Sequence, residues 1–285
     1  MSENPKTLGQ LVGAYVTEQC TVLVDAEAGL RNGENLIHPT RVAVRRLRST
    51  IRVYSDLFDV ARTGRLEEEL VWWAGLLGAV RDLDVLGSRL EGLLADLPPE
   101  LVLGPVQRTV QTELGVRRKE AFDVVQQTLD TDRYRALVGL AEQWRSDPPL
   151  TEAAAKPAAA VTGYVKRAKK KVEKRLAASV GAAKAGEPFA ELLHGARKAG
   201  KRHRYAVEAA APALGAKAEK VIDERKALQD VLGEHHDAVV SAEFLRGLGA
   251  RLGVRSGQNG FTYGLLYARE QALGDRLLTD LKPFS

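Results

Sequence analysis

Five arginines fall within residues 37–54, a stretch that contains no aspartate or glutamate. Each residue turns an α-helix by about 100°, so side chains three, four or seven positions apart lie on one face. A basic row with this spacing consists of His38, Arg41, Arg45, Arg48 and Arg52. Guanidinium groups present a planar fork of donors that fits phosphate oxygens, and they stay charged. The spacing therefore predicts a row of anion-binding groups along one helix.

A second basic row repeats the first one later in the chain. It consists of His194, Arg197, Lys201 and Arg204. A shift of 156 residues places the second row on the first, and Glu208 stands where the first row has Arg52. The sequence Leu-Gly with an Asp four residues after the Gly recurs at an offset of 155, at 77–82 and 232–237. Because both pairs keep their order and spacing, we infer two tandem copies of one helical unit.

The first basic row borders an apolar face. That face consists of Val44, Leu47, Ile51, Tyr54 and Phe58. An apolar face packs against the core, so the neighbouring arginines are expected to be partly sheltered, while Arg46 points elsewhere. Like charges four residues apart cost a few tenths of a kcal/mol per pair. We expect Asp82, Asp84 and Asp237 to offset part of this repulsion and an extended, multivalent anion to offset the rest.

A third basic run covers residues 164–178. Its apolar positions follow helical spacing, and Lys166 and Lys169 flank them, so both lysines could add to the same anion site. The remaining cations of the run are interpreted as solvent-facing. They are Lys170, Lys171, Lys174 and Arg175.

Composition narrows the class of protein. The formal net charge of +5 divides into −4 for residues 1–150 and +9 for residues 151–285. The chain has no apolar run long enough to cross a membrane, and its first residues do not resemble a secretory signal. The single cysteine, Cys20, cannot form an internal disulfide and is expected to be buried. No Gly-rich phosphate loop followed by Lys is present, which argues against a nucleotide site of that type. A cytoplasmic location fits these features.

Apolar residues recur at helical spacing along almost the whole chain, which predicts an all-α protein. Helices are expected at 6–30, 38–58, 64–96, 100–127, 131–146, 158–180, 188–211, 215–247 and 258–281. Helix breakers separate them, including the glycine-rich stretch 253–260, and Gly75, Gly78 and Gly87 are candidate interruptions within the third helix. The Pro- and Ala-rich segment 148–157 is the predicted linker between an N-terminal half at 1–147 and a C-terminal half at 158–285.

The two basic rows and the segments after them resemble the CHAD domain, the conserved histidine α-helical domain. The pattern is His-x-x-Arg-x-x-x-Arg-Arg-x-Arg, repeated with Lys at its third basic position, and it is followed by "LLGAVRDLDVL" and "LQDVLGEHHDAVV". The resemblance covers nearly all of residues 1–285. It implies one domain made of two four-helix bundles, related by a pseudo-twofold axis, with a basic cavity between them.

The resemblance also implies that the protein binds inorganic polyphosphate without catalysis. By position, the expected ligand set comprises both basic rows, with Arg81 and Lys226 as secondary candidates. We expect no cofactor and no metal. Polyphosphate is the expected partner. Granule proteins and polyphosphate-metabolising enzymes are further candidate partners, and polyphosphate granules are a candidate location. A membrane partner is not expected.

Two other functions remain as alternatives. Nucleic-acid binding fits the charge, but single-strand binding normally places stacking aromatics beside the cations, and only Tyr54 and Tyr205 lie near the rows. A metal-dependent phosphohydrolase would use His235, His236 and Asp237. The corresponding stretch of the first copy is "AVRD", which puts Arg81 where the second copy has His236.

Overall fold

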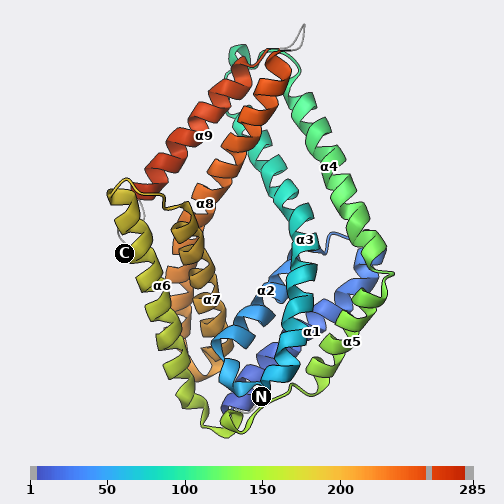
Figure 1. The fold of residues 1–285 in the computed structure, drawn as a ribbon, viewed down its shortest axis with the longest axis vertical. Helices are drawn as coiled ribbons and strands as arrows, with labels where there is room; N and C mark the ends of the chain where they lie inside the picture. Colours follow the sequence, from blue (N-terminus) through green and yellow to red (C-terminus); the bar gives the residue numbers. More distant parts are fainter. Residues whose placement is uncertain (1–4, 255–258, 280–285) are drawn as a thin grey trace. The chain divides into compact units, whose positions relative to one another are not determined.

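The computed structural model describes residues 5–254 and 259–279. Over these ranges the chain forms α-helices joined by short 3₁₀ turns, with two isolated β-bridges and no strand. The α-helices are α1 Leu8–Arg31, α2 Ile37–Val53, α3 Val60–Ala95, α4 Val106–Thr128, α5 Asp132–Ser146, α6 Val161–Lys184, α7 Ala190–Leu214, α8 Ala216–Gly253 and α9 Phe261–Thr279 (Figure 1). The predicted all-α class is confirmed.

Local chemistry explains several helix ends. Helix α1 begins at a capping box in which Thr7 and Gln10 bond each other's backbone N–H groups. Helix α2 ends at Val53 instead of the predicted 58, because residues 55–57 tighten into a 3₁₀ turn. The predicted interruptions of the third helix are wrong, since α3 continues through all three glycines. The predicted break at 253–260 includes residues 255–258, which lie outside the described residues. The same holds for residues 280 and 281 of the predicted last helix.

The described residues divide into two compact units. Unit 1 comprises residues 5–78 and 124–229, and unit 2 comprises residues 79–123, 230–254 and 259–279. Helices α3, α4 and α8 pass from one unit into the other without a break. Each unit takes residues from both sides of the predicted linker at 148–157. The predicted tandem halves and their pseudo-twofold relation stay predictions.

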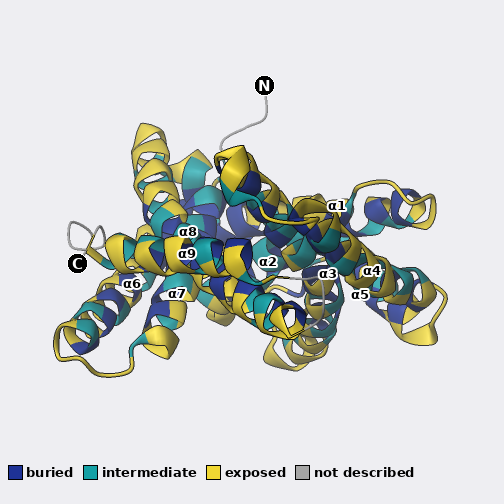
Figure 2. Cartoon of the chain, turned by 90° about the horizontal axis from the view of Figure 1, so that it is seen from above, coloured by how far each residue is buried: buried dark blue, intermediate teal, exposed yellow. Residues whose placement is uncertain are grey.

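The core of unit 1 is built from α1, α2, α5, α6 and α7 with the first part of α3. Stacked and tilted aromatic pairs fill it, with ring centroids 5.6 Å apart for Phe58 and Trp144 and 4.9 Å apart for Trp73 and Tyr134. Cys20 is fully buried, as expected, and burial raises the pKa of its thiol to about 12. Figure 2 shows the buried and exposed faces of the helices.

The core of unit 2 is a leucine-rich cluster from four helix segments. It contains Leu86, Leu90 and Leu94 of α3, Val106, Val110 and Leu114 of α4, Leu245, Leu248 and Leu252 of α8, and Tyr263 and Leu266 of α9. Within each helix these residues recur at intervals of three or four, so one face of every helix is buried. Unit 2 therefore has its own hydrophobic core.

Candidate anion-binding site

The two predicted basic rows lie on α2 and α7, which pack against each other in unit 1 (Figure 1). The hydroxyl of Tyr54, at the end of α2, donates a 2.7 Å hydrogen bond to the carbonyl of Ala206 on α7. Both partners are buried, so this bond fixes the end of α2 against α7. Every predicted ligand residue belongs to unit 1 except Arg81, which is half-buried in unit 2.

Five cations from α2 and α7 influence one another electrostatically. This α2–α7 cluster consists of Arg41, Arg45, Arg197, Lys201 and Arg204. Burial and then the charges of the other four lower the pKa of Lys201 to about 7. Burial also lowers the pKa of Arg45, with Arg41 and its α7 neighbours acting in the same direction against an opposing effect of Tyr205. Within the described part of the chain, neither Lys201 nor Arg45 has a carboxylate partner. The cluster thus gathers like charges in a partly desolvated place.

One member of this cluster packs against a glycine of α3. The guanidinium of Arg41 lies over Gly78 of α3, where an added Cβ would be 3.4 Å from Nη2. Gly78 belongs to the Leu-Gly pair that is repeated in the sequence. The guanidinium of Arg41 therefore packs directly against the backbone of α3 at this glycine.

Glu208 of α7 is a carboxylate that lies beside arginines of both α2 and α7. Its Oε2 accepts hydrogen bonds from the Tyr15 hydroxyl at 2.9 Å and from Arg46 Nε at 3.0 Å. Its Oε1 lies 3.3 Å from Arg204 Nε. Both arginines also lie over the ring of Tyr205, at 5.9 Å and 4.9 Å from its centroid. One row member, Arg204, is therefore ion-paired, and Arg46 is held on the same carboxylate.

A second group of guanidiniums surrounds Glu67 of α3. This Glu67 cluster consists of Arg48, Arg52, Arg175, Arg202 and Glu67. Arg52 Nε donates to the Glu67 carboxylate, and Arg175 Nη1 donates to the carbonyl of Gly195 at 3.0 Å. The pKa of Arg202 is lowered by burial and then by Arg52, Arg175 and Arg48, with Glu67 opposing. The sequence interpretation of Arg175 as solvent-facing is wrong, because its side chain is half-buried against α7.

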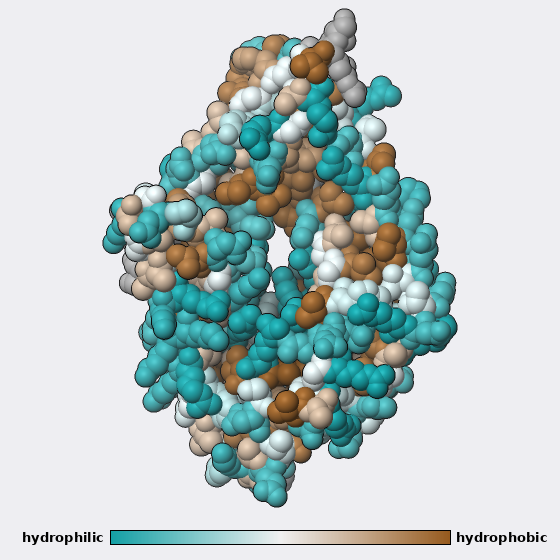
Figure 3. Space-filling model, in the orientation of Figure 1, coloured by the Kyte–Doolittle hydropathy of each residue, from teal (hydrophilic) through white to brown (hydrophobic). Residues whose placement is uncertain are grey.

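The remaining predicted ligand residues of unit 1 are exposed at the surface. His38 and His194 are exposed, and partial burial and the charges of Lys198 and Arg197 lower the pKa of His194. Lys166 is exposed on α6, Lys169 lies 3.6 Å from Glu173, and Lys226 donates to Asp223 at 3.0 Å. Figure 3 shows the hydrophilic surface along α6.

Asp84 does not act as the counter-ion that the sequence suggested. Its carboxylate accepts a hydrogen bond from Arg118 Nε at 2.5 Å, within unit 2. Two other carboxylates do compensate members of the basic rows. Glu67 pairs with Arg52 and Glu208 with Arg204, and the sequence reasoning did not assign either of them to this role.

His203 is a buried histidine that belongs to neither row. It is fully buried on α7, and both ring nitrogens lack a hydrogen-bond partner among the described residues. Burial, with Arg225 and Lys169 contributing, lowers its pKa to about 4. The imidazole is therefore neutral at physiological pH, and it adds no positive charge to the rows.

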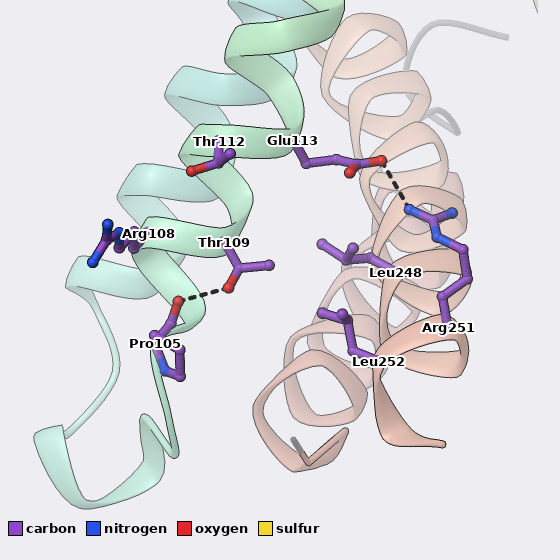
Figure 4. A pocket seen from close by; sticks show the side chains of 8 residues that line it. All are labelled: Pro105, Arg108, Thr109, Thr112, Glu113, Leu248, Arg251 and Leu252. Atoms are coloured by element: carbon purple, nitrogen blue, oxygen red, sulfur yellow. Dashed lines mark hydrogen bonds and ion pairs between the residues drawn. The ribbon is translucent and has the colours of Figure 1, made fainter. Parts of the chain in front are cut away.

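Unit 2 contains a pocket of about 410 Å³ between α4 and α8. Figure 4 shows its lining, which consists of Pro105, Arg108, Thr109, Thr112, Glu113, Leu248, Arg251 and Leu252. Arg251 donates to Glu113 at 2.9 Å, so one of the two lining cations is neutralised. Among the described residues no group of three His, Cys, Asp or Glu side chains could hold a metal ion, and no helix is long and apolar enough to cross a membrane.

Comparisons with known proteins agree with this fold. Solved structures that resemble the chain include PptA from Streptomyces chartreusis, with a TM-score of 0.77 at 20% identity over 98% of this chain and 99% of that one. The crystal structure of the CHAD domain from the plant Ricinus communis has a TM-score of 0.71 at 25% identity, over 99% of this chain and 93% of that one.

Two curated proteins of Mycobacterium tuberculosis are also similar: Uncharacterized protein MT2285 (strain CDC 1551 / Oshkosh) and Uncharacterized protein Rv2226 (strain ATCC 25618 / H37Rv). Each is 31% identical over 99% of this chain, and the chain spans about half (54%) of their length. The sequence pattern of the CHAD domain matches residues 14–246. The chain belongs to the CHAD domain family.

Proposed function

We propose that the protein binds inorganic polyphosphate at the α2–α7 cluster and does not hydrolyse it. The polymer carries about one negative charge per internal phosphate, and its oxygens accept hydrogen bonds from guanidinium and ammonium groups. Successive phosphates along an extended chain match cations that recur every three or four residues along a helix. The family is linked to polyphosphate binding, which supports this ligand class.

One observation carries the proposal: Lys201 and Arg45 are half-buried among like charges without a carboxylate partner in the described residues. Such groups destabilise the folded protein unless an anion joins them. A polyanion supplies many acceptor oxygens at once, and its binding relieves the repulsion of all five cations. We therefore assign the contacts with phosphate first to the α2–α7 cluster and then to the flanking His38, His194, Lys166, Lys169 and Lys226.

The aromatic environment favours polyphosphate over single-stranded nucleic acid. Tyr54 and Tyr205 are both buried, and the ring of Tyr205 lies beneath the guanidiniums of Arg46 and Arg204. Neither ring is available to stack on a base, which is how single-strand binders gain much of their affinity. Polyphosphate has no bases and needs no such platform.

Binding to a polymer would also explain a role in the cell. A protein that holds polyphosphate through electrostatic contacts would collect on polyphosphate granules and meet the enzymes that make or degrade the polymer. The curated relatives are about twice as long as this chain, so the activity of those whole proteins is a separate matter.

The first prediction concerns the double variant Arg45→Glu, Lys201→Glu. It replaces two cations at the centre of the cluster by carboxylates, so affinity for long-chain polyphosphate should fall more than 100-fold, about 1.4 kcal/mol for each factor of ten. Isothermal titration calorimetry with polyphosphates of graded length measures this loss. Circular dichroism checks that the helical content is unchanged.

Lys170→Glu, Lys171→Glu is the matched control. It makes the same change in net charge on the exposed face of α6, and its affinity should change less than fivefold. Retained affinity in the Arg45, Lys201 variant would refute the site. Equal competition by single-stranded DNA of the same charge would favour nucleic acid instead.

A further inference from the structure

The Glu67 cluster lies partly on a different face of α7 from the second basic row. Gly195 and Arg202 are seven residues apart and share one face, whereas Arg202 is turned about 100° from Lys201. Arg175 of α6 reaches this face, because its Nη1 donates to the carbonyl of Gly195. An added Cβ on Gly195 would come within 3.2 Å of that nitrogen, so the glycine leaves space for the guanidinium.

The charges in this cluster are unbalanced. Four guanidiniums act on one another, while Glu67 is the carboxylate that opposes them. Arg48 Nε is buried and has no hydrogen-bond partner within the described residues. Arg202 is half-buried, and the pKa values of both arginines are lowered, first by burial. The cluster has more donors than its single carboxylate can accept from.

We propose that Arg48, Arg52, Arg175 and Arg202 form a second phosphoryl subsite, in which Glu67 occupies the place of the anion until a phosphate group displaces it. This inference rests on the proposed function, because the ligand is the same polymer. It adds two arginines that lie outside both basic rows, and it gives Glu67 the role of an internal competitor.

The chemistry of the two anions supports displacement. A carboxylate offers two acceptor oxygens. One internal phosphate of the polymer also offers two non-bridging oxygens, but the neighbouring phosphates of the same chain bring further acceptors to the cluster. The Glu67 side chain is 26% exposed and Arg52 is 40% exposed, so solvent and ligand reach the pair. In the ligand-free protein Glu67 lowers the repulsion among the arginines. In the complex the polymer does so instead.

The decisive variant is Glu67→Gln, which removes the competing charge and keeps the shape of the side chain. Affinity for tripolyphosphate and for long-chain polyphosphate should rise about three- to fivefold, the size of an exposed ion pair. The matched control is Glu69→Gln on the same helix. Glu69 is similarly exposed at 20% and pairs with Arg133, which belongs to neither cluster. The Glu69→Gln variant makes the same change in net charge, and its affinity should stay within twofold of the wild-type value.

A second set of variants tests whether the gain arises in this cluster. Arg202→Gln should weaken binding about threefold, and adding it to Glu67→Gln should remove most of the gain, because the freed donors are then incomplete. Thermal unfolding of each variant shows whether a change in affinity is accompanied by a change in the stability of the fold.

The outcomes distinguish the two proposals. If the wild-type protein does not bind polyphosphate, the proposed function fails. If the wild-type protein binds but Glu67→Gln binds equally or more weakly than Glu69→Gln, the subsite is overturned and the proposed function stands. An equal gain in both variants would indicate a general charge effect and would also overturn the subsite.

Discussion

Arg89 in unit 2 and the cations of the α2–α7 cluster in unit 1 are all shielded from solvent to some extent, but they differ in whether carboxylates neutralise them. Arg89 donates from Nε and Nη2 to Glu270, at 2.5 Å and 3.2 Å, and from Nη1 to Glu234 at 2.7 Å. Glu270 is only 1% exposed, whereas Glu234 is 46% exposed, so one guanidinium is matched by a buried carboxylate and by a second one at the surface. In the α2–α7 cluster five cations gather; Arg204 is paired with Glu208, but Lys201 and Arg45 have no carboxylate partner among the described residues.

The difference separates a cation that the fold itself neutralises from cations that we propose to be ligand contacts. A buried charge needs a partner, because desolvation costs several kcal/mol per ion. The fold supplies that partner to Arg89. For Lys201 and Arg45 the described residues supply none, and their lowered pKa values report the resulting strain on the charged forms. An external polyanion is the partner that would complete this cluster.

The largest effect on stability is expected for Arg89→Met. The change leaves Glu270 buried without its partner, so the free energy of unfolding should fall by about 3–5 kcal/mol. Urea denaturation followed by circular dichroism measures the loss, and polyphosphate affinity should remain within twofold at a temperature where the variant is folded. Arg117→Met, which removes an exposed pair with Glu113, should cost less than about 1 kcal/mol. A similar small cost for Arg89→Met would contradict the contrast.

Binding to the α2–α7 cluster should also depend on pH. Lys201, with a pKa of about 7 in the free protein, is mostly protonated at pH 6 and mostly neutral at pH 8.5. A bound anion favours the charged form, so binding takes up a proton, and affinity for long-chain polyphosphate should fall up to about tenfold over this range. Calorimetry in buffers of different ionisation enthalpy detects the proton. Lys201→Arg stays charged and should bind with little change over the same range.

The smallest effect is expected for the stability of the ligand-free Lys201→Met variant. In the wild-type protein the folded state holds the Lys201 proton less tightly than the unfolded state, so stability should rise with pH from about 7 toward 10. The variant lacks this dependence and should be more stable than wild type at pH 6, by about 1 kcal/mol. Thermal unfolding from pH 6 to 9 gives both curves. Lower stability of the variant at pH 6 would show that Lys201 has a structural partner.

The helices could be predicted from the sequence because apolar periodicity is a local property. The basic rows followed from the same rotation of about 100° per residue. The sequence also showed that Glu208 replaces Arg52 in the second copy. Its actual role, holding Tyr15, Arg46 and Arg204 together, depends on how α1, α2 and α7 cross, which no local pattern records.

The Glu67 cluster was missed for a related reason. Arg202 lies off the predicted row, and Arg175 sits in a lysine-rich run that looks solvated in sequence. Their neighbours come from α2, α3, α6 and α7, so only the tertiary packing brings them together. Similarly, His203 carried no signal in the sequence that distinguishes a fully buried histidine from the exposed His194.

The passage of α3, α4 and α8 between the two compact units limits how the protein can be dissected. Cutting the chain at 148–157 would leave both fragments with pieces of each hydrophobic core and neither core whole. Shortening it from its C-terminal side through α9 would strip Tyr263 and Leu266 from unit 2 while leaving both basic rows in place. Removal of one function by deleting a fragment is therefore a poor strategy here, and point substitutions are the appropriate tool.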